Sequence, residues 1–222
     1  MFNIKKFNEI KQILKKKAEN CQIIAISKNH PRESVSEAIE HGVLEFGENR
    51  VAEAKEKFNE LKTIHPNIKL HLTGPLQSNK VKIASSLFDI FHTLDREKIA
   101  IEFSKHKDKL FKKEIFIQVN TGKEKNKSGI FPNELFEFKD FCINDMELNI
   151  VGLMCIPPIK DDPRVHFKIL QDLLQKCNLN KLSIGMSNDY EVAIKFNPAY
   201  IRLGTILFGK RIWNPASQSI PI

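Results

Sequence analysis

The chain has 222 residues, of which 41% are hydrophobic and 28% are charged. This balance is typical of a single globular domain that buries its own core, and it excludes a disordered chain, a collagen or coiled-coil rod and a disulfide scaffold. The 35 Lys and Arg residues outnumber the 27 Asp and Glu residues, which gives a formal net charge of +8. Because the basic residues are mostly lysines interleaved with acidic residues, we expect a solvated surface and no specific nucleic-acid binding.

The sequence also bears on where the protein resides. Its amino terminus lacks the continuous apolar stretch of about 7–15 residues that a signal peptide needs, and no later run approaches the ~18 residues of a membrane span. The four cysteines contain no CxxC pair, so we expect neither a zinc site nor a disulfide framework. We therefore predict a cytoplasmic protein without a membrane partner.

The first predicted element is an amphipathic helix. Its apolar residues Ile4, Phe7, Ile10 and Leu14 recur at helical spacing, with lysines between them. We expect this stripe to cover the core and the lysines to face water. The helix occupies residues 1–20 of a single predicted domain that spans residues 1–222, and we expect residues 212–222 to form a surface tail.

Eight short apolar or alternating segments follow and predict strands. They span residues 22–27, 43–46, 69–73, 89–94, 115–120, 149–156, 181–186 and 199–203. Segments with helical periodicity lie between them, at residues 32–41, 50–61, 79–87, 97–103, 132–142, 163–177 and 189–196.

The alternation of strand and helix predicts βαβ units and a parallel sheet. Eight such units in one domain close a (β/α)8 TIM barrel, which is the α/β fold that we predict. The alternative is an open doubly wound sheet. However, no GxGxxG follows the first strand to indicate a dinucleotide site.

In such a barrel the functional residues lie at the carboxyl ends of the strands. Lys28 directly follows the first predicted strand. An amine at the mouth of a dry barrel loses hydration, which lowers its pKa from about 10.4 and favours imine formation. The alternative is a lysine that extends into water.

Polar residues after the last two strands indicate a phosphate site. Ser187 follows the seventh strand, and Gly204 and Thr205 follow the eighth. Barrels of this kind frequently bind phosphate at these loops, where glycine admits the backbone and hydroxyls donate hydrogen bonds. Helix capping by Ser187 and Thr205 is an alternative that is compatible with this role. Arg202 lies on the eighth strand, so its side chain can point into the barrel or out of it. A guanidinium only donates hydrogen bonds, so it would keep the pyridine nitrogen of a ligand in the barrel unprotonated.

Several longer motifs resemble the pyridoxal phosphate homeostasis proteins, which are relatives of the amino-terminal barrel of alanine racemase. The motifs are AISK at 25–28, FGENR at 46–50, HLTGPLQSNK at 71–80, GKEKNKSG at 122–129, GLM at 152–154, SIGMSNDYEVAI at 183–194 and IRLGTILFGKR at 201–211. The resemblance implies an alanine racemase N-terminal-domain-like barrel that holds pyridoxal 5′-phosphate. The implied cofactor-binding residues are Lys28 as the imine lysine, Asn49 beside the ring, Arg202 at the pyridine nitrogen, Ser187, Gly204 and Thr205 at the phosphate, and Lys80 as a second lysine at the mouth that assists transfer.

The predicted function is to hold the cofactor as a lysine imine and to take part in its intracellular homeostasis and delivery. Pyridoxal-phosphate-dependent apo-enzymes are the candidate recipients, and we expect a monomer or weak dimer. Family members commonly have a lysine where this chain has His30. The resemblance therefore implies no role for His30 in the transfer of the cofactor.

The alternative function is a racemase-like or imine-forming enzyme. A two-base racemase needs an acid or base on each face of the imine. In alanine racemase the second is a tyrosine from a separate carboxyl-terminal domain, which we do not expect here, and Tyr190 and Tyr200 are not placed to replace it. We therefore predict no catalytic residues and no efficient racemase activity. The histidines form no HExxH or HxH motif, so no metal site is predicted.

Overall fold

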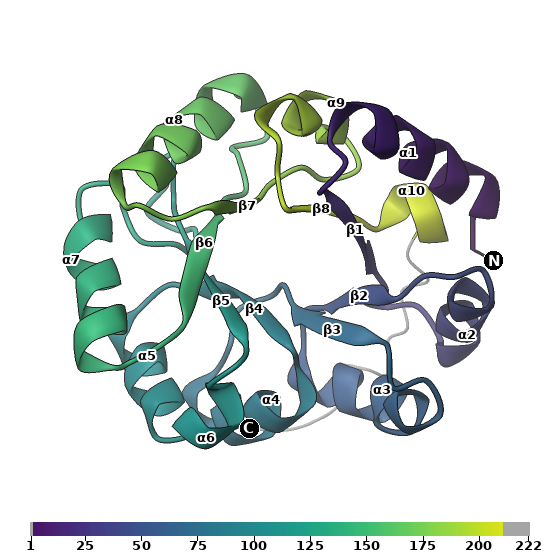
Figure 1. The fold of residues 1–222 in the computed structure, drawn as a ribbon, viewed down its shortest axis with the longest axis horizontal. Helices are drawn as coiled ribbons and strands as arrows, with labels where there is room; N and C mark the ends of the chain where they lie inside the picture. The colour runs from purple at the N-terminus through teal and green to yellow at the C-terminus, as the bar shows by residue number, and fades with distance from the viewer. Residues whose placement is uncertain (1, 211–222) are drawn as a thin grey trace.

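A computed structural model describes residues 2–210, whose strands close into a barrel (Figure 1). Each strand pairs in parallel with the next one along the chain, and the last pairs with the first. This arrangement confirms the predicted (β/α)8 fold. The strands are β1 (Gln22–Ile26), β2 (Glu45–Glu48), β3 (Lys69–Leu72), β4 (Ile90–Leu94), β5 (Glu114–Gln118), β6 (Ile150–Met154), β7 (Lys181–Ser183) and β8 (Tyr200–Leu203).

Helices surround the barrel (Figure 1). The α-helices are α1 (Ile4–Lys17), α2 (Arg32–Glu40), α3 (Val51–Ile64), α4 (Val81–Leu87), α5 (Glu97–Ser104), α6 (Lys107–Leu110), α7 (Leu135–Asp140), α8 (Pro163–Lys176), α9 (Tyr190–Ala193) and α10 (Thr205–Phe208). Two 3-10 turns, η1 (Ser78–Lys80) and η3 (Ile194–Phe196), and the π-helix η2 (Phe141–Asp145) complete the layer. Within residues 2–210, no helix has the length and apolar character needed to cross a bilayer.

Local sequence signals explain how two of the three longest described helices, α1 and α8, begin. The Asn3 side chain accepts a hydrogen bond from the Lys6 amide (3.0 Å) at the start of α1. Asp162 does the same for the Arg164 amide (2.9 Å) at α8, where Pro163 takes the first helical position.

Two apolar clusters hold the layers together. The larger one lies mainly between the strands and the helices and includes the predicted α1 residues Phe7, Ile10 and Leu14. Because successive strand residues face opposite sides of a sheet, a smaller cluster fills the barrel interior. Its buried members are Ile24, Ile26, Ile90, Phe116, Met154 and Tyr200.

The structure differs from the sequence-based boundaries at a few elements. The second strand begins two residues later than predicted, because Gly42 adopts a positive φ of 81° and Val43 and Leu44 belong to the connection after this turn. The short helices α6 and α10 were not predicted, since four residues are too few to show helical periodicity. The predicted tail at 212–222 lies outside the described residues.

Candidate functional site

A cavity of about 250 Å³ lies where the strands end and their loops begin. This volume suits a small molecule. The cavity brings together six of the seven predicted cofactor-binding residues. It is lined by Ile26, Lys28, Asn49, Thr73, Ile156, Met186, Ser187, Asn188, Arg202, Gly204 and Thr205.

The lining is electropositive, since it combines two cationic side chains with hydroxyls and amides. The described residues that line it include no Asp or Glu. Such a set of donors favours an anionic ligand. Lys80, the seventh predicted residue, lies in η1 after β3 and is outside this lining.

Lys28 is half-buried and directly follows Ser27, which is fully buried at the end of β1. The next residue, Asn29, has a left-handed backbone with φ at 59°, a conformation that asparagine tolerates better than most residues. The chain therefore turns sharply just after Lys28, at the rim of the cavity.

Asn49 is held from two sides. The Thr73 hydroxyl donates a hydrogen bond to Asn49 Oδ1 (3.1 Å), and Gly74 packs against the Asn49 backbone. A Cβ at Gly74 would stand 2.4 Å from the Asn49 carbonyl oxygen, so only glycine permits this approach. Sequence reasoning missed Thr73, although its position at the carboxyl end of the third predicted strand was an available signal.

Arg202 points into the barrel interior, where it is buried. Its Nη1 donates to the Ser183 carbonyl oxygen (2.7 Å) and to Ser183 Oγ (2.7 Å), and its Nη2 donates to the Cys155 carbonyl oxygen (2.9 Å). Burial lowers the pKa of Arg202, but a guanidinium remains protonated in proteins. Toward the described residues it uses three of its five N–H donors, so Nε–H and one Nη2 hydrogen have no partner among them.

A hydrogen-bonded chain continues from Arg202 through the barrel. Ser183 Oγ lies 2.9 Å from His92 Nδ1, His92 Nε2 lies 2.9 Å from His71 Nδ1, and His71 Nε2 lies 2.6 Å from Glu45 Oε2. Arg202 can only donate and the Glu45 carboxylate can only accept, so Ser183 Oγ accepts from Arg202 and His71 Nε2 donates to Glu45. Both ring nitrogens of His92 therefore have a partner within the barrel, Ser183 on one side and His71 on the other.

The surroundings of His92 favour the neutral form of its ring. Burial lowers its pKa well below the usual value, and His71 and the charge of Arg202 lower it further. Its ring stacks on Phe116 with a centroid distance of 4.8 Å. His71 and His92 are therefore hydrogen-bonded residues of the barrel core.

The predicted phosphate residues also lie together. Ser187 Oγ accepts a hydrogen bond from the Ile206 amide (3.5 Å) in the first turn of α10, which begins at Thr205. A Cβ at Gly204 would stand 3.4 Å from the Ile26 Cβ, and both residues line the cavity. Helix capping and the proposed anion binding therefore involve the same two loops.

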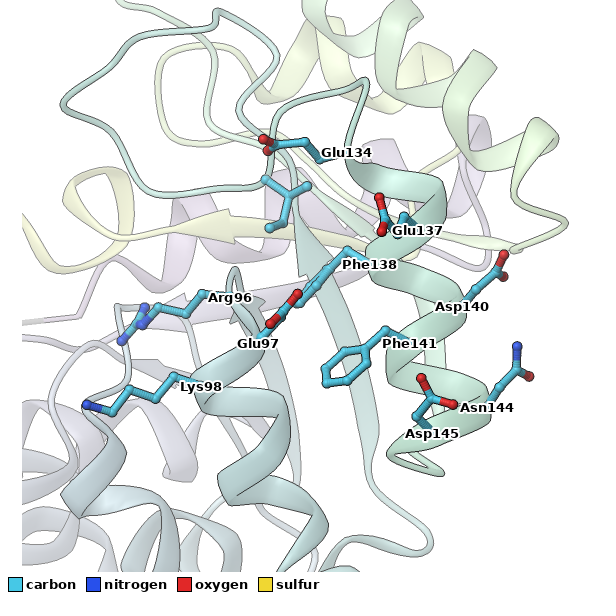
Figure 2. Close-up of a pocket in the computed structure, with 11 residues that line it drawn as sticks. Arg96, Glu97, Lys98, Glu134, Glu137, Phe138, Asp140, Phe141, Asn144 and Asp145 are labelled. Carbon is cyan, nitrogen blue, oxygen red and sulfur yellow. The ribbon is translucent and has the colours of Figure 1, made fainter.

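A larger hollow of about 860 Å³ lies in the helical layer, between α5 and the α7–η2 segment (Figure 2). Its lining includes the carboxylates of Glu97, Glu134, Glu137, Asp140 and Asp145. This acidic surface does not suit a phosphate ligand, and none of the predicted site residues lines it.

Comparison with known families agrees with the barrel fold. The family profile described as "Alanine racemase, N-terminal domain" matches residues 4–212. An alanine racemase from Clostridium difficile shares the fold, with a TM-score of 0.74 and 16% identity over 96% of this chain and 57% of that one. The fold therefore belongs to the alanine racemase amino-terminal barrel class.

Closer relatives define the family within this class. The pyridoxal phosphate homeostasis protein of Vibrio cholerae is 38% identical over 203 residues, which cover 86% of each protein. The protein of the same name from Aquifex aeolicus is 35% identical and covers 88% of this chain and 90% of its own. PipY of Synechococcus elongatus, whose structure is known with PLP bound, is 32% identical with a TM-score of 0.81 over 93% of this chain and 99% of its own. The chain belongs to the pyridoxal phosphate homeostasis protein family.

Proposed function

We propose that the cavity binds pyridoxal 5′-phosphate and that the protein takes part in the homeostasis of this cofactor. The observation that carries the proposal is the convergence of Lys28, Arg202 and Ser187 with Gly204 and Thr205 on one electropositive cavity at the carboxyl ends of the strands. The names of the relatives and the PLP-bound structure of PipY support it.

The described residues fit each part of the cofactor. The Ser187 and Thr205 hydroxyls provide donors for the phosphate, and Asn49 contributes to the wall beside the ring. The remaining Arg202 donors suit the pyridine nitrogen, which they would keep unprotonated. Lys28 Nζ would attack the aldehyde carbon, form a C=N bond and release the aldehyde oxygen as water.

We further propose that the protein carries and delivers the cofactor in the cytoplasm to PLP-dependent apo-enzymes and is not an efficient racemase. Among the described residues that line the cavity, Lys28 is the one side chain with the chemistry of a general base. Racemisation needs a second acid or base on the opposite face. Lys80 would then assist transfer from outside the cavity.

Absorption spectroscopy of the purified protein mixed with pyridoxal 5′-phosphate tests the proposal. We expect an imine band in the wild-type protein and in K80A, but not in K28A. Because a lysine at the rim contributes little to packing, K28A should still unfold cooperatively. An unchanged imine band in a folded K28A variant would refute the assignment.

A further inference from the structure

The backbone around Lys28 is held by a buried charge cluster that the proposed function leaves unexplained. Lys57 Nζ, from α3, donates a hydrogen bond to the Ser27 carbonyl oxygen (2.7 Å). Glu53 Oε1, one turn earlier on α3, accepts from the Asn29 amide (2.5 Å). Both peptide groups that flank Lys28 are therefore bonded to neighbouring side chains of one helix.

The cluster is closed by ion pairs. Lys57 Nζ lies 2.7 Å from Glu48 Oε1 and 2.8 Å from Glu53 Oε1, and the Ser27 hydroxyl donates to Glu48 Oε1 (2.7 Å). The side chain of Lys57 is 8% exposed and that of Glu48 is 0% exposed. Lysine and glutamate are rarely buried to this extent, even as a pair, because desolvation offsets much of their attraction.

We propose that Lys57 and Glu53 are positioning residues for Lys28, holding the peptide groups on both of its sides so that its amine is directed into the cavity. The inference rests on the proposed function, in which Lys28 bears the cofactor. Its physical basis is that reaction rates fall steeply when a reacting group moves by about 1 Å. A lysine on a freely moving loop would sample many orientations, whereas two anchored peptides restrict the backbone of Lys28.

Glu48 has a distinct part in the cluster. Its Oε2 is buried and has no hydrogen-bond partner among the described residues. Burial raises its pKa to about 7, against the opposing effect of Lys57. Glu48 therefore supports the cluster through Oε1 alone, which lies against both Lys57 Nζ and the Ser27 hydroxyl.

The test separates imine formation from cofactor binding. In K57M, we expect the rate of imine formation with pyridoxal 5′-phosphate to fall on the order of 10- to 100-fold. The affinity for pyridoxine 5′-phosphate, which has the ring and phosphate but an alcohol in place of the aldehyde, should change less than about twofold. A role in general stability would instead weaken both.

Two further variants guard against misfolding and nonspecific effects. E53A removes the acceptor of the Asn29 amide at a partly exposed position, and should also slow imine formation, whereas E53Q keeps an oxygen acceptor and should restore it. K113M is the matched control, since Lys113 also donates to backbone carbonyl oxygens, those of Ser85 and Phe88, but lies before β5. It should leave the rate unchanged.

Hydrogen exchange at the Asn29 amide gives a readout that does not need the cofactor. We expect exchange at least tenfold faster in E53A than in E53Q or K113M. Wild-type rates of imine formation together with unchanged exchange in K57M and E53A would overturn the inference. If the wild-type protein forms no imine, the proposed function fails, and the exchange at Asn29 still decides whether the cluster holds this backbone.

Discussion

Replacement of Ser183 by alanine tests the hydrogen-bonded chain that begins at Arg202. The Ser183 hydroxyl accepts from a buried guanidinium and is hydrogen-bonded to His92 Nδ1, and its residue is 0% exposed. A hydrogen bond to a charged group contributes about 1.5–3 kcal/mol, and a buried acceptor left unpaired costs about 1–3 kcal/mol. Arg202 keeps the Ser183 carbonyl oxygen as a partner, so we expect a total loss of about 2–4 kcal/mol.

Ser85 provides the matched control for this variant. It is also 0% exposed, but its hydroxyl has no hydrogen-bond partner among the described residues. S85A should therefore leave the stability unchanged or increase it by about 1 kcal/mol, since alanine also favours helix α4. Urea denaturation followed by circular dichroism measures both free energies of unfolding. Equal losses in S183A and S85A would refute the assigned chain.

Three further predictions address the cavity and its surroundings. S187A and T205V should each weaken pyridoxal 5′-phosphate binding by about 1.5–3 kcal/mol but leave pyridoxal binding unchanged in titrations, because pyridoxal lacks the phosphate; equal losses for both ligands would exclude a phosphate role. Burial raises the pKa of Glu48 from 4.5 to about 7, so the folded protein retains a proton that the unfolded chain releases. As the pH rises from 4.5 to 7, the titration of Glu48 should lower the free energy of unfolding by about 3 kcal/mol. Denaturation at pH values across this range should show a smaller fall in E48Q. Mass spectrometry should show that solvent deuterium enters the Cα position of alanine barely faster than with free cofactor, because a missing acid or base lowers the reaction rate about 10²–10⁴-fold. Rapid exchange that depends on Lys28 would indicate an enzyme.

The sequence predicted the barrel because its signals are local and repeated. Each strand is a short apolar segment, and each long helix shows its own periodicity, so eight alternations were sufficient to indicate closure. The same rule placed Lys28 and Ser187 after strands and Arg202 on the last strand, and the family resemblance added Asn49; the structure brings all four to one cavity.

The interactions that support these residues were not predictable in this way. Ser183 is one of many serines, and its contact with His92 depends on two strands that are 91 residues apart along the chain. Lys57 and Glu53 have the spacing of an ordinary exposed helical pair, yet they are directed inward. Lys80 is the reverse case. Its motif predicted a cofactor-binding residue, but in the structure Lys80 lies in η1, outside the cavity lining.

Borohydride reduction followed by peptide mapping tests the central claim most directly. The chain contains 29 lysines, so accidental modification would spread over many of them. After incubation with pyridoxal 5′-phosphate and reduction, we predict that the stable label lies on Lys28, and that K28A carries no comparable label at any other lysine. A label concentrated on another lysine, or distributed over the exposed lysines and equal in K28A, would contradict the assignment of this cavity as the cofactor site.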